Sequence, residues 1–362
     1  MRLLGMATAV LAACAVTVAG TAPAHASPSR SASSSAPLLG SVASPSVSRI
    51  AGADRYATSV AASRTAFPTG THPDVVYLVS GTSPWESLSA TPAAVRQNGG
   101  VLLTRGDGIP SSTAGELKRL APRSIVVVGA SSTISNTVVS QAKSYAPDVR
   151  RIAGSSRYQT AQALVRDAFP AGSATTAWIA TGAVWTDGLV AGVAAAAHRA
   201  PLLTVHGSAT SLHSSTVALI RDLGVTSVTL VGTTTNVSSG IEVQLDGILG
   251  AENVIRASGS DRYAVAARVG SLAFPDLSAG TAYLANGRDF VNGLAGAFLA
   301  GTRKRPLYLT VPFCVPASVR PTLAGPPSPA WRSWAARGRC AAWWGSSSGA
   351  GASRRHPACG SW

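Results

Sequence analysis

Short apolar runs recur along this chain without polar alternation, and stretches of good helix formers separate them. Val75–Gly81 and Ser227–Gly232 both end in glycine, and Pro201–Thr204 is a similar run. Runs of this length and character are typical of strands in a parallel sheet that is covered by helices on both faces. The pattern therefore predicts an α/β fold.

Helices are predicted between these runs. Asp54 is a good N-cap, and the helix formers that follow the Arg55-Tyr56 pair end before Phe67. A stretch of small residues, Leu189–His198, and a second stretch around Ser215–Leu223 predict two more helices. The alternation of strands and helices predicts layered βα units.

The same landmarks occur three times at nearly constant spacing, which indicates internal repeats. The octapeptide Arg49–Tyr56 recurs as Arg151–Tyr158 and Arg256–Tyr263, at steps of 102 and 105 residues. A Phe-Pro pair begins 11 residues after each of these tyrosines. A glycine at the end of an apolar run is followed seven positions later by a leucine in each copy, as in Gly81 and Leu88. The chain is therefore predicted to contain three copies of one module.

These motifs resemble the cell-wall-binding repeat type 2 of Gram-positive surface proteins. The resemblance covers roughly residues 48–325. It rests on the Arg-Tyr openings, on the aromatic segments that follow the glycines, and on the apolar runs Leu102–Thr104, Pro201–Thr204 and Pro306–Thr310. It departs from the family pattern in lacking the proline of the aromatic segment and in replacing the second glycine of a strand end by Ala130 and Thr233.

The resemblance implies three tandem Rossmann-like or Toprim-like modules, with parallel sheets flanked by helices, in a pseudo-threefold arrangement. It also implies non-covalent, non-catalytic anchoring to an anionic secondary polymer of the wall or to peptidoglycan, with no cofactor. The implied divisions are repeat 1 at 48–149, repeat 2 at 150–254 and an incomplete repeat 3 at 255–325.

The N-terminal region has the features of an export signal. Residues 1–26 combine Arg2, an apolar stretch and a small-x-small cleavage site at Ala24–Ala26, which predicts a signal peptide. Cleavage and acylation at Cys14 is an alternative. Residues 27–47 are rich in Ser, Pro and Ala and predict a linker. The mature protein is expected at the cell surface or secreted, with no transmembrane segment.

The net charge of +15 overstates how basic the repeats are. Residues 303–362 hold nine Lys or Arg and no Asp or Glu, which leaves a net charge of +6 for residues 1–302. That mild basicity suits an anionic polymer, and no run of basic residues interleaved with aromatics indicates nucleic-acid binding. We expect no nucleic-acid partner.

Residues 326–362 form a basic, tryptophan-rich tail where repeat 3 should continue into a strand. The codons of Ala330–Arg337, read from the third base of the first, can encode Val-Ala-Val-Leu-Gly-Gly. A frameshift therefore accounts for the tail, and an unstructured basic tail is the alternative. Outside the signal segment the cysteines number three, which gives no disulfide framework.

Two sets of residues are candidates for polymer binding. A guanidinium at a helix start suits an anion, and aromatic rings after a strand end stack on sugars. Alternatively the aspartates cap the helices, the arginines bond internally or bridge modules, and the rings pack between modules. The candidates are Arg55, Tyr56, Arg157, Tyr158, Arg262, Tyr263, Trp85, Trp185 and Phe290.

Catalysis is not expected. His72, His198, His206 and His213 are dispersed without metal-binding spacing, and Asn292 replaces the acidic residues Glu86 and Asp187 in the third copy. Neither a nucleotide-binding loop nor a nucleophile elbow occurs. A peptidoglycan hydrolase (amidase) or its modifier subunit remains the alternative function, and a surface-layer or adhesive protein is a further one.

Overall fold

The first module forms around a strand that is buried along its whole length, as its run of apolar residues predicts. In the computed structural model, which describes residues 46–275 and 280–323, four parallel strands stand in the order β2-β1-β3-β4. The strands are β1 (Val75–Ser80), β2 (Gly100–Thr104), β3 (Ser124–Val128) and β4 (Asp148–Ile152). The helices are α1 (Arg55–Ala66), α2 (Trp85–Arg96), α3 (Ser111–Leu120) and α4 (Asn136–Ala142).

The second module repeats this topology, with strand order β6-β5-β7-β8 and all pairs parallel. Its strands are β5 (Thr176–Thr181), β6 (Leu202–Val205), β7 (Ser227–Val231) and β8 (Val254–Ala257). Its helices are α5 (Arg157–Ala168), α6 (Trp185–Ala197), α7 (Ser214–Leu223) and α8 (Ser239–Leu249), with a 3₁₀ turn at Ala251–Asn253. The predicted parallel α/β architecture is confirmed in both modules.

The third module is shorter within the described residues. It comprises α9 (Arg262–Ala273), β9 (Tyr283–Asn286), α10 (Phe290–Thr302), β10 (Leu307–Thr310) and the single turn α11 (Arg320–Leu323). β9 pairs in parallel with β10, and Leu284 on β9 is 42% exposed. Leu78 and Ile179, which hold the equivalent positions, are fully buried because β3 and β7 lie beside them.

The last strand of each complete sheet crosses a predicted repeat boundary. The division between residues 149 and 150 falls inside β4, and the division between 254 and 255 falls inside β8. Arg151 on β4 donates to the carbonyl of Gly129 at 2.6 Å, and Arg256 on β8 donates to the carbonyl of Gly232 at 3.1 Å. The segments that open the second and third sequence repeats therefore complete the sheets of the preceding modules.

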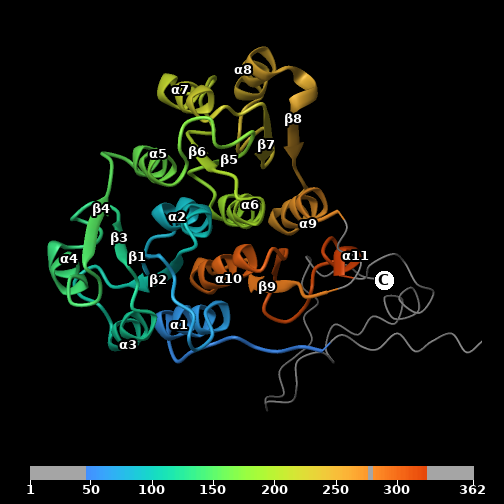
Figure 1. Cartoon of the computed structure of the whole chain (residues 1–362). Coiled ribbons are helices and arrows are strands. Elements are labelled where there is room, and N and C mark those ends of the chain that lie inside the picture. Colours follow the sequence, from blue (N-terminus) through green and yellow to red (C-terminus); the bar gives the residue numbers. More distant parts are fainter. Residues whose placement is uncertain (1–45, 276–279, 324–362) are drawn as a thin grey trace, which may run out of the picture. The chain divides into compact units, whose positions relative to one another are not determined.

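Three central helices, α2, α6 and α10, pack against one another, and each contributes small residues to the contacts (Figure 1). A Cβ added to Gly188 would lie 2.7 Å from Leu88 Cδ1, and one added to Gly293 would lie 2.8 Å from Leu189 Cδ2. Each of these leucines thus fills the space left by a glycine of the next central helix. The equivalent of these glycines in α2 is Ser87, which is 1% exposed.

The C-caps of the central helices link the modules in a closed ring. Gln97 donates to the carbonyl of Asp167 at 2.9 Å, and His198 donates to the carbonyl of Ala273 at 2.8 Å. Arg303 of the third module donates to the carbonyl of Thr65 in the first at 2.5 Å. In each case the acceptor lies in the last turn of the helix that begins with the arginine–tyrosine pair of the next module, namely α5, α9 or α1. All three modules are therefore connected. This ring agrees with the expected pseudo-threefold arrangement.

Several predictions concern residues that the structure does not describe. The signal peptide, most of the linker, the tail at 326–362 and its frameshift all lie outside the described residues. Among the described helices, none has the length and apolar character needed to cross a bilayer. Cys314 is disulfide-bonded.

Candidate functional site

The three arginine–tyrosine pairs begin three equivalent helices, α1, α5 and α9. The side chains of Asp54, Ser156 and Asp261 cap these helices by accepting backbone N–H groups. Each arginine then donates from Nη1 to the carbonyl of the glycine that follows the first strand of its module. The distances are 2.5 Å for Arg55 to Gly81, 2.8 Å for Arg157 to Gly182 and 2.7 Å for Arg262 to Gly287. The same internal hydrogen bond thus recurs three times.

The tyrosine of each pair explains why the strand must end in glycine. A Cβ added to Gly81 would lie 2.7 Å from Cε1 of Tyr56, and one added to Gly182 would lie 2.5 Å from Cε1 of Tyr158. Tyr263 approaches Gly287 in the same way, at 2.8 Å. The repeated glycine is therefore needed for close packing of the tyrosine ring, which would clash with any larger side chain.

The aromatic candidates, which were expected after a strand end, lie at the first residue of each central helix. Helix α6 begins at Trp185, before the predicted start at Leu189. The guanidinium of Arg157 lies 4.3 Å from the centre of the Trp85 ring, although the two residues belong to different modules. Trp185 and Phe290 meet edge to face with their ring centres 6.3 Å apart. All three rings are thus half-buried and take part in contacts between modules.

Asp187, in the first turn of α6, is a buried carboxyl that the sequence analysis set aside. It is 2% exposed, and its Oδ2 accepts a 2.7 Å hydrogen bond from Asn236. Burial raises the pKa of Asp187 to about 6, although the hydrogen bonds from Asn236 and Thr186 and the charge of Arg262 act in the opposite direction. Its counterpart Glu86 is half-buried and accepts a hydrogen bond from Ser83.

These residues combine two properties that suit an anionic glycan. Arg55 and Arg157 are half-buried and Arg262 is exposed, and the guanidinium of Arg157 lies over the half-buried ring of Trp85. Guanidinium groups bind phosphates and carboxylates, and aromatic rings stack on sugars. We refer to Arg55, Arg157, Arg262, Trp85, Trp185 and Phe290 as the arginine–aromatic surface.

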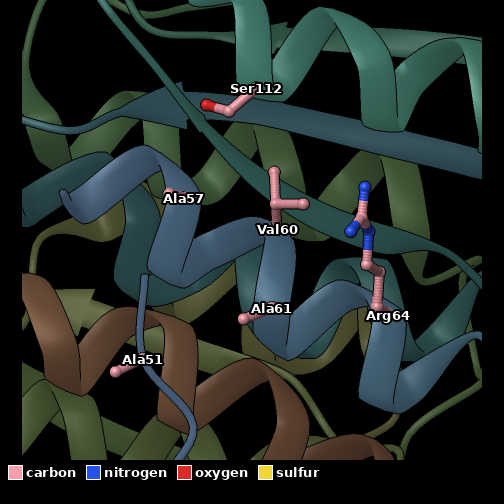
Figure 2. A pocket seen from close by; sticks show the side chains of 6 residues that line it. All are labelled: Ala51, Ala57, Val60, Ala61, Arg64 and Ser112. Carbon is pink, nitrogen blue, oxygen red and sulfur yellow. The ribbon is translucent and has the colours of Figure 1, made fainter. Parts of the chain in front are cut away.

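A hollow lies beside α1, away from these residues (Figure 2). Its volume is about 490 Å³, and its lining is mostly methyl groups. The side chains are Ala51, Ala57, Val60, Ala61, Arg64 and Ser112. Arg64 is paired with Glu116 at 3.2 Å, so the hollow offers little that could recognise a polar polymer. The arginine–aromatic surface is the better candidate.

The histidines in the described parts of the chain make individual hydrogen bonds and do not cluster. His72 bonds the carbonyl of Leu120 and His198 that of Ala273, while His206 and His213 contact neighbouring serines. Nowhere in the described ranges do three His, Cys, Asp or Glu side chains come together in a way that could hold a metal ion.

Comparison with known families identifies the repeat. The sequence model for "Cell wall binding domain 2 (CWB2)" matches three segments, at residues 49–139, 151–242 and 256–322. The chain belongs to the cell wall binding domain 2 family. Each matched segment begins at the arginine that opens a sequence repeat, so the family's repeats coincide with the three copies in this chain.

Two curated relatives from Bacillus subtilis strain 168 are similar to this chain. The chain is 32% identical over 265 residues to the N-acetylmuramoyl-L-alanine amidase LytC, and the match covers 73% of this chain and 50% of LytC. It is 28% identical over 272 residues to an amidase enhancer, and the match covers 75% of this chain and 36% of the enhancer. The chain thus corresponds to half or less of the length of these relatives.

Two solved structures from Clostridium difficile share the fold. Cwp6 is 27% identical with a TM-score of 0.69, and the match covers 76% of this chain and 43% of Cwp6. Cwp8 is 24% identical with a TM-score of 0.67, and the match covers 76% of this chain and 46% of Cwp8. The likeness to Cwp8 concerns the fold alone.

Proposed function

We propose that this chain binds the cell wall without catalysing a reaction, and that it uses the arginine–aromatic surface to hold an anionic wall polymer. The observation that carries the proposal is the recurrence of one arrangement in three modules: an arginine at a helix start is fixed to the carbonyl of a strand-end glycine, and an aromatic residue begins the central helix that follows this glycine. A polymer with repeating anionic units can contact several equivalent sites at once, which increases its avidity.

Location and export follow from the same proposal. A protein that holds a wall polymer acts at the cell surface, which is consistent with the signal peptide predicted for residues 1–26 and the linker predicted for 27–47. Family membership supports a cell-wall location, and it leaves the polymer unspecified. An acid-extractable secondary polymer and peptidoglycan itself are both anionic candidates.

Replacing Arg55, Arg157 and Arg262 together by alanine tests the surface. We expect retention on purified walls to fall by about tenfold or more, because charge-assisted contacts to anionic groups are lost. Co-sedimentation of folded protein with walls, at increasing protein concentration, measures the change. The fold is checked by circular dichroism, because the same arginines bond Gly81, Gly182 and Gly287.

The matched control replaces Arg123, Arg221 and Arg268 by alanine. These arginines are exposed and do not belong to the arginine–aromatic surface, and their replacement removes the same total charge. We expect this control to retain most of its binding. If a folded Arg55/Arg157/Arg262 variant binds walls as well as the control does, the arginine–aromatic surface is not the binding site.

A second candidate function is modification of a wall hydrolase, which the likeness to an amidase and an amidase enhancer favours. A zymogram on peptidoglycan distinguishes the two. Binding without clearing, alone or with added amidase, supports the anchor. Stronger clearing by an added amidase would instead support the second function, and a clearing band from the chain alone would show that the chain is itself a hydrolase.

A further inference from the structure

A polar cleft of about 180 Å³ lies in the second module, at the carboxyl ends of β5, β6 and β7. Ligands of parallel α/β sheets bind at this edge, where the loops after the strands diverge. The side chains that matter are Tyr158, Thr181, His206, Ser208, Thr235 and Asn236. They come from four different loops or elements, so the cleft exists only in the folded module. We call it the module-2 cleft.

The lining combines two rings with hydroxyl and amide groups. The rings of Tyr158 and His206 have centres 5.8 Å apart and are tilted by 47°. Ser208 Oγ lies 3.3 Å from His206 Nδ1, and Thr181 Oγ1 accepts the backbone N–H of Ala183. Rings that pack on a sugar face, beside short hydroxyl and amide groups that meet its substituents, are the usual components of a site for a pyranose.

The charge near the cleft favours an uncharged occupant. Asn236 lines the cleft, and its Nδ2 donates to the buried carboxyl of Asp187. The side-chain carbonyl oxygen of Asn236 takes no part in that bond. Arg157, the nearest predicted anion-binding residue in the sequence, lies over Trp85 and does not line the cleft. A carboxyl behind the cleft and no lysine or arginine in its lining disfavour a phosphate or carboxylate ligand.

The other modules differ at the same positions. The glycine after the first strand of each module donates its N–H to the last residue of the second strand, and this shared bond aligns the three modules. The bonds are Gly81 to Thr104, Gly182 to Val205 and Gly287 to Thr310. The next residue is Arg105 in the first module, His206 in the second and Val311 in the third. In the first module Arg105 pairs with Asp107 at 3.3 Å, and Thr133 replaces Asn236. The ring pair and the amide therefore occur together in the second module alone.

We infer that the module-2 cleft binds one uncharged pyranose unit of a wall glycan, and that the chain has one such site. This inference rests on the proposed function, since it assumes that the chain meets a wall glycan, and it names a contact separate from the arginine–aromatic surface. The cleft binds a neutral sugar, whereas the arginine–aromatic surface binds the anionic groups of the polymer. The neutral contact gives selectivity that charge alone cannot provide.

Isothermal titration of the full chain tests the inference with two probes. A β-1,4-linked N-acetylglucosamine tetramer represents the glycan strand of peptidoglycan, and neutral glycan released from walls by mild acid represents the secondary polymer. We expect one of the two to bind with one site per chain, and to bind equally well in low and high salt. The probe that binds identifies the source of the sugar.

His206→Ala should weaken this binding by about tenfold or more, because a ring contact and a hydrogen-bonding group are lost. His206→Gln keeps a polar side chain and removes the ring, so it should weaken binding as well. Arg105→Ala, at the equivalent position of the first module, is the matched control and should bind like the wild type.

Three results would overturn the inference: no binding of either probe to the wild type, unchanged affinity in both folded His206 variants, or three sites per chain. None of these results depends on retention on whole walls, which the triple-arginine experiment measures. A wild-type chain that is not retained on walls and still binds the sugar would refute the proposed function and leave the module-2 cleft standing.

Discussion

Leu189→Ala is expected to lower the free energy of unfolding by about 2–5 kcal/mol, the range for removing a fully buried leucine side chain. Leu189 on α6 is 1% exposed and packs onto Gly293 of α10, in the contact between the second and third modules. Urea denaturation followed by circular dichroism measures the effect as a lower midpoint of the first transition.

Leu284→Ala is the matched control, because Leu284 is 42% exposed and the same atoms are removed. We expect a change of less than about 1 kcal/mol for this variant, since little buried apolar area is lost. Equal effects of the two substitutions would show that the contacts between the central helices do not stabilise the protein.

Asp187→Asn is expected to remove a pH dependence of stability on the order of 3 kcal/mol between about pH 3.5 and 7. The pKa of Asp187 is raised from 3.8 to about 6 by burial, so the folded protein binds this proton more tightly than the unfolded chain does. The resulting stabilisation is complete below pH 3.8, declines as the pH rises through 6, and is absent above it. An asparagine cannot ionise and can still accept the hydrogen bond from Asn236.

The measurement is the free energy of unfolding of both proteins at pH 4 and pH 7. We expect the variant to gain stability relative to the wild type as the pH rises, because the other titrating groups are shared and cancel. Glu86→Gln, at the equivalent and more exposed position of the first module, controls for loss of a charge at a central helix. A constant difference between Asp187→Asn and wild type across this range would contradict the assignment.

The sequence was sufficient to predict the repeats, the parallel sheets and the helix that follows each arginine–tyrosine pair. These features have local signals: apolar runs, an aspartate before a helix, and glycines at fixed spacing. The predicted helix around Ser215–Leu223 is α7 at Ser214–Leu223, and the predicted strand from Ser227 is β7. Such elements depend on residues that are close in the sequence.

Contacts between modules could not be predicted in the same way. Gln97, His198 and Arg303 stand at equivalent positions and make the same kind of hydrogen bond, yet they are three different residue types, so an alignment of the repeats shows no shared signal. The internal role of the arginines was an open alternative, because the partner is a backbone carbonyl about 25 residues away. Asp187 was set aside because Asn292 replaces it in the third copy, and its burial is visible only in the folded module.

Wall binding itself is the central claim, and co-sedimentation of the full chain with purified walls tests it most directly. Walls are used in two forms, intact and after acid extraction of the secondary polymer, at equal mass and at several salt concentrations. We predict saturable binding to intact walls. This binding should weaken as the salt concentration rises, because the arginine–aromatic surface binds an anionic polymer, and it should fall sharply after the secondary polymer is extracted. Absence of saturable binding to intact walls would contradict the account, and equal binding to both forms would identify peptidoglycan, not the secondary polymer, as the ligand.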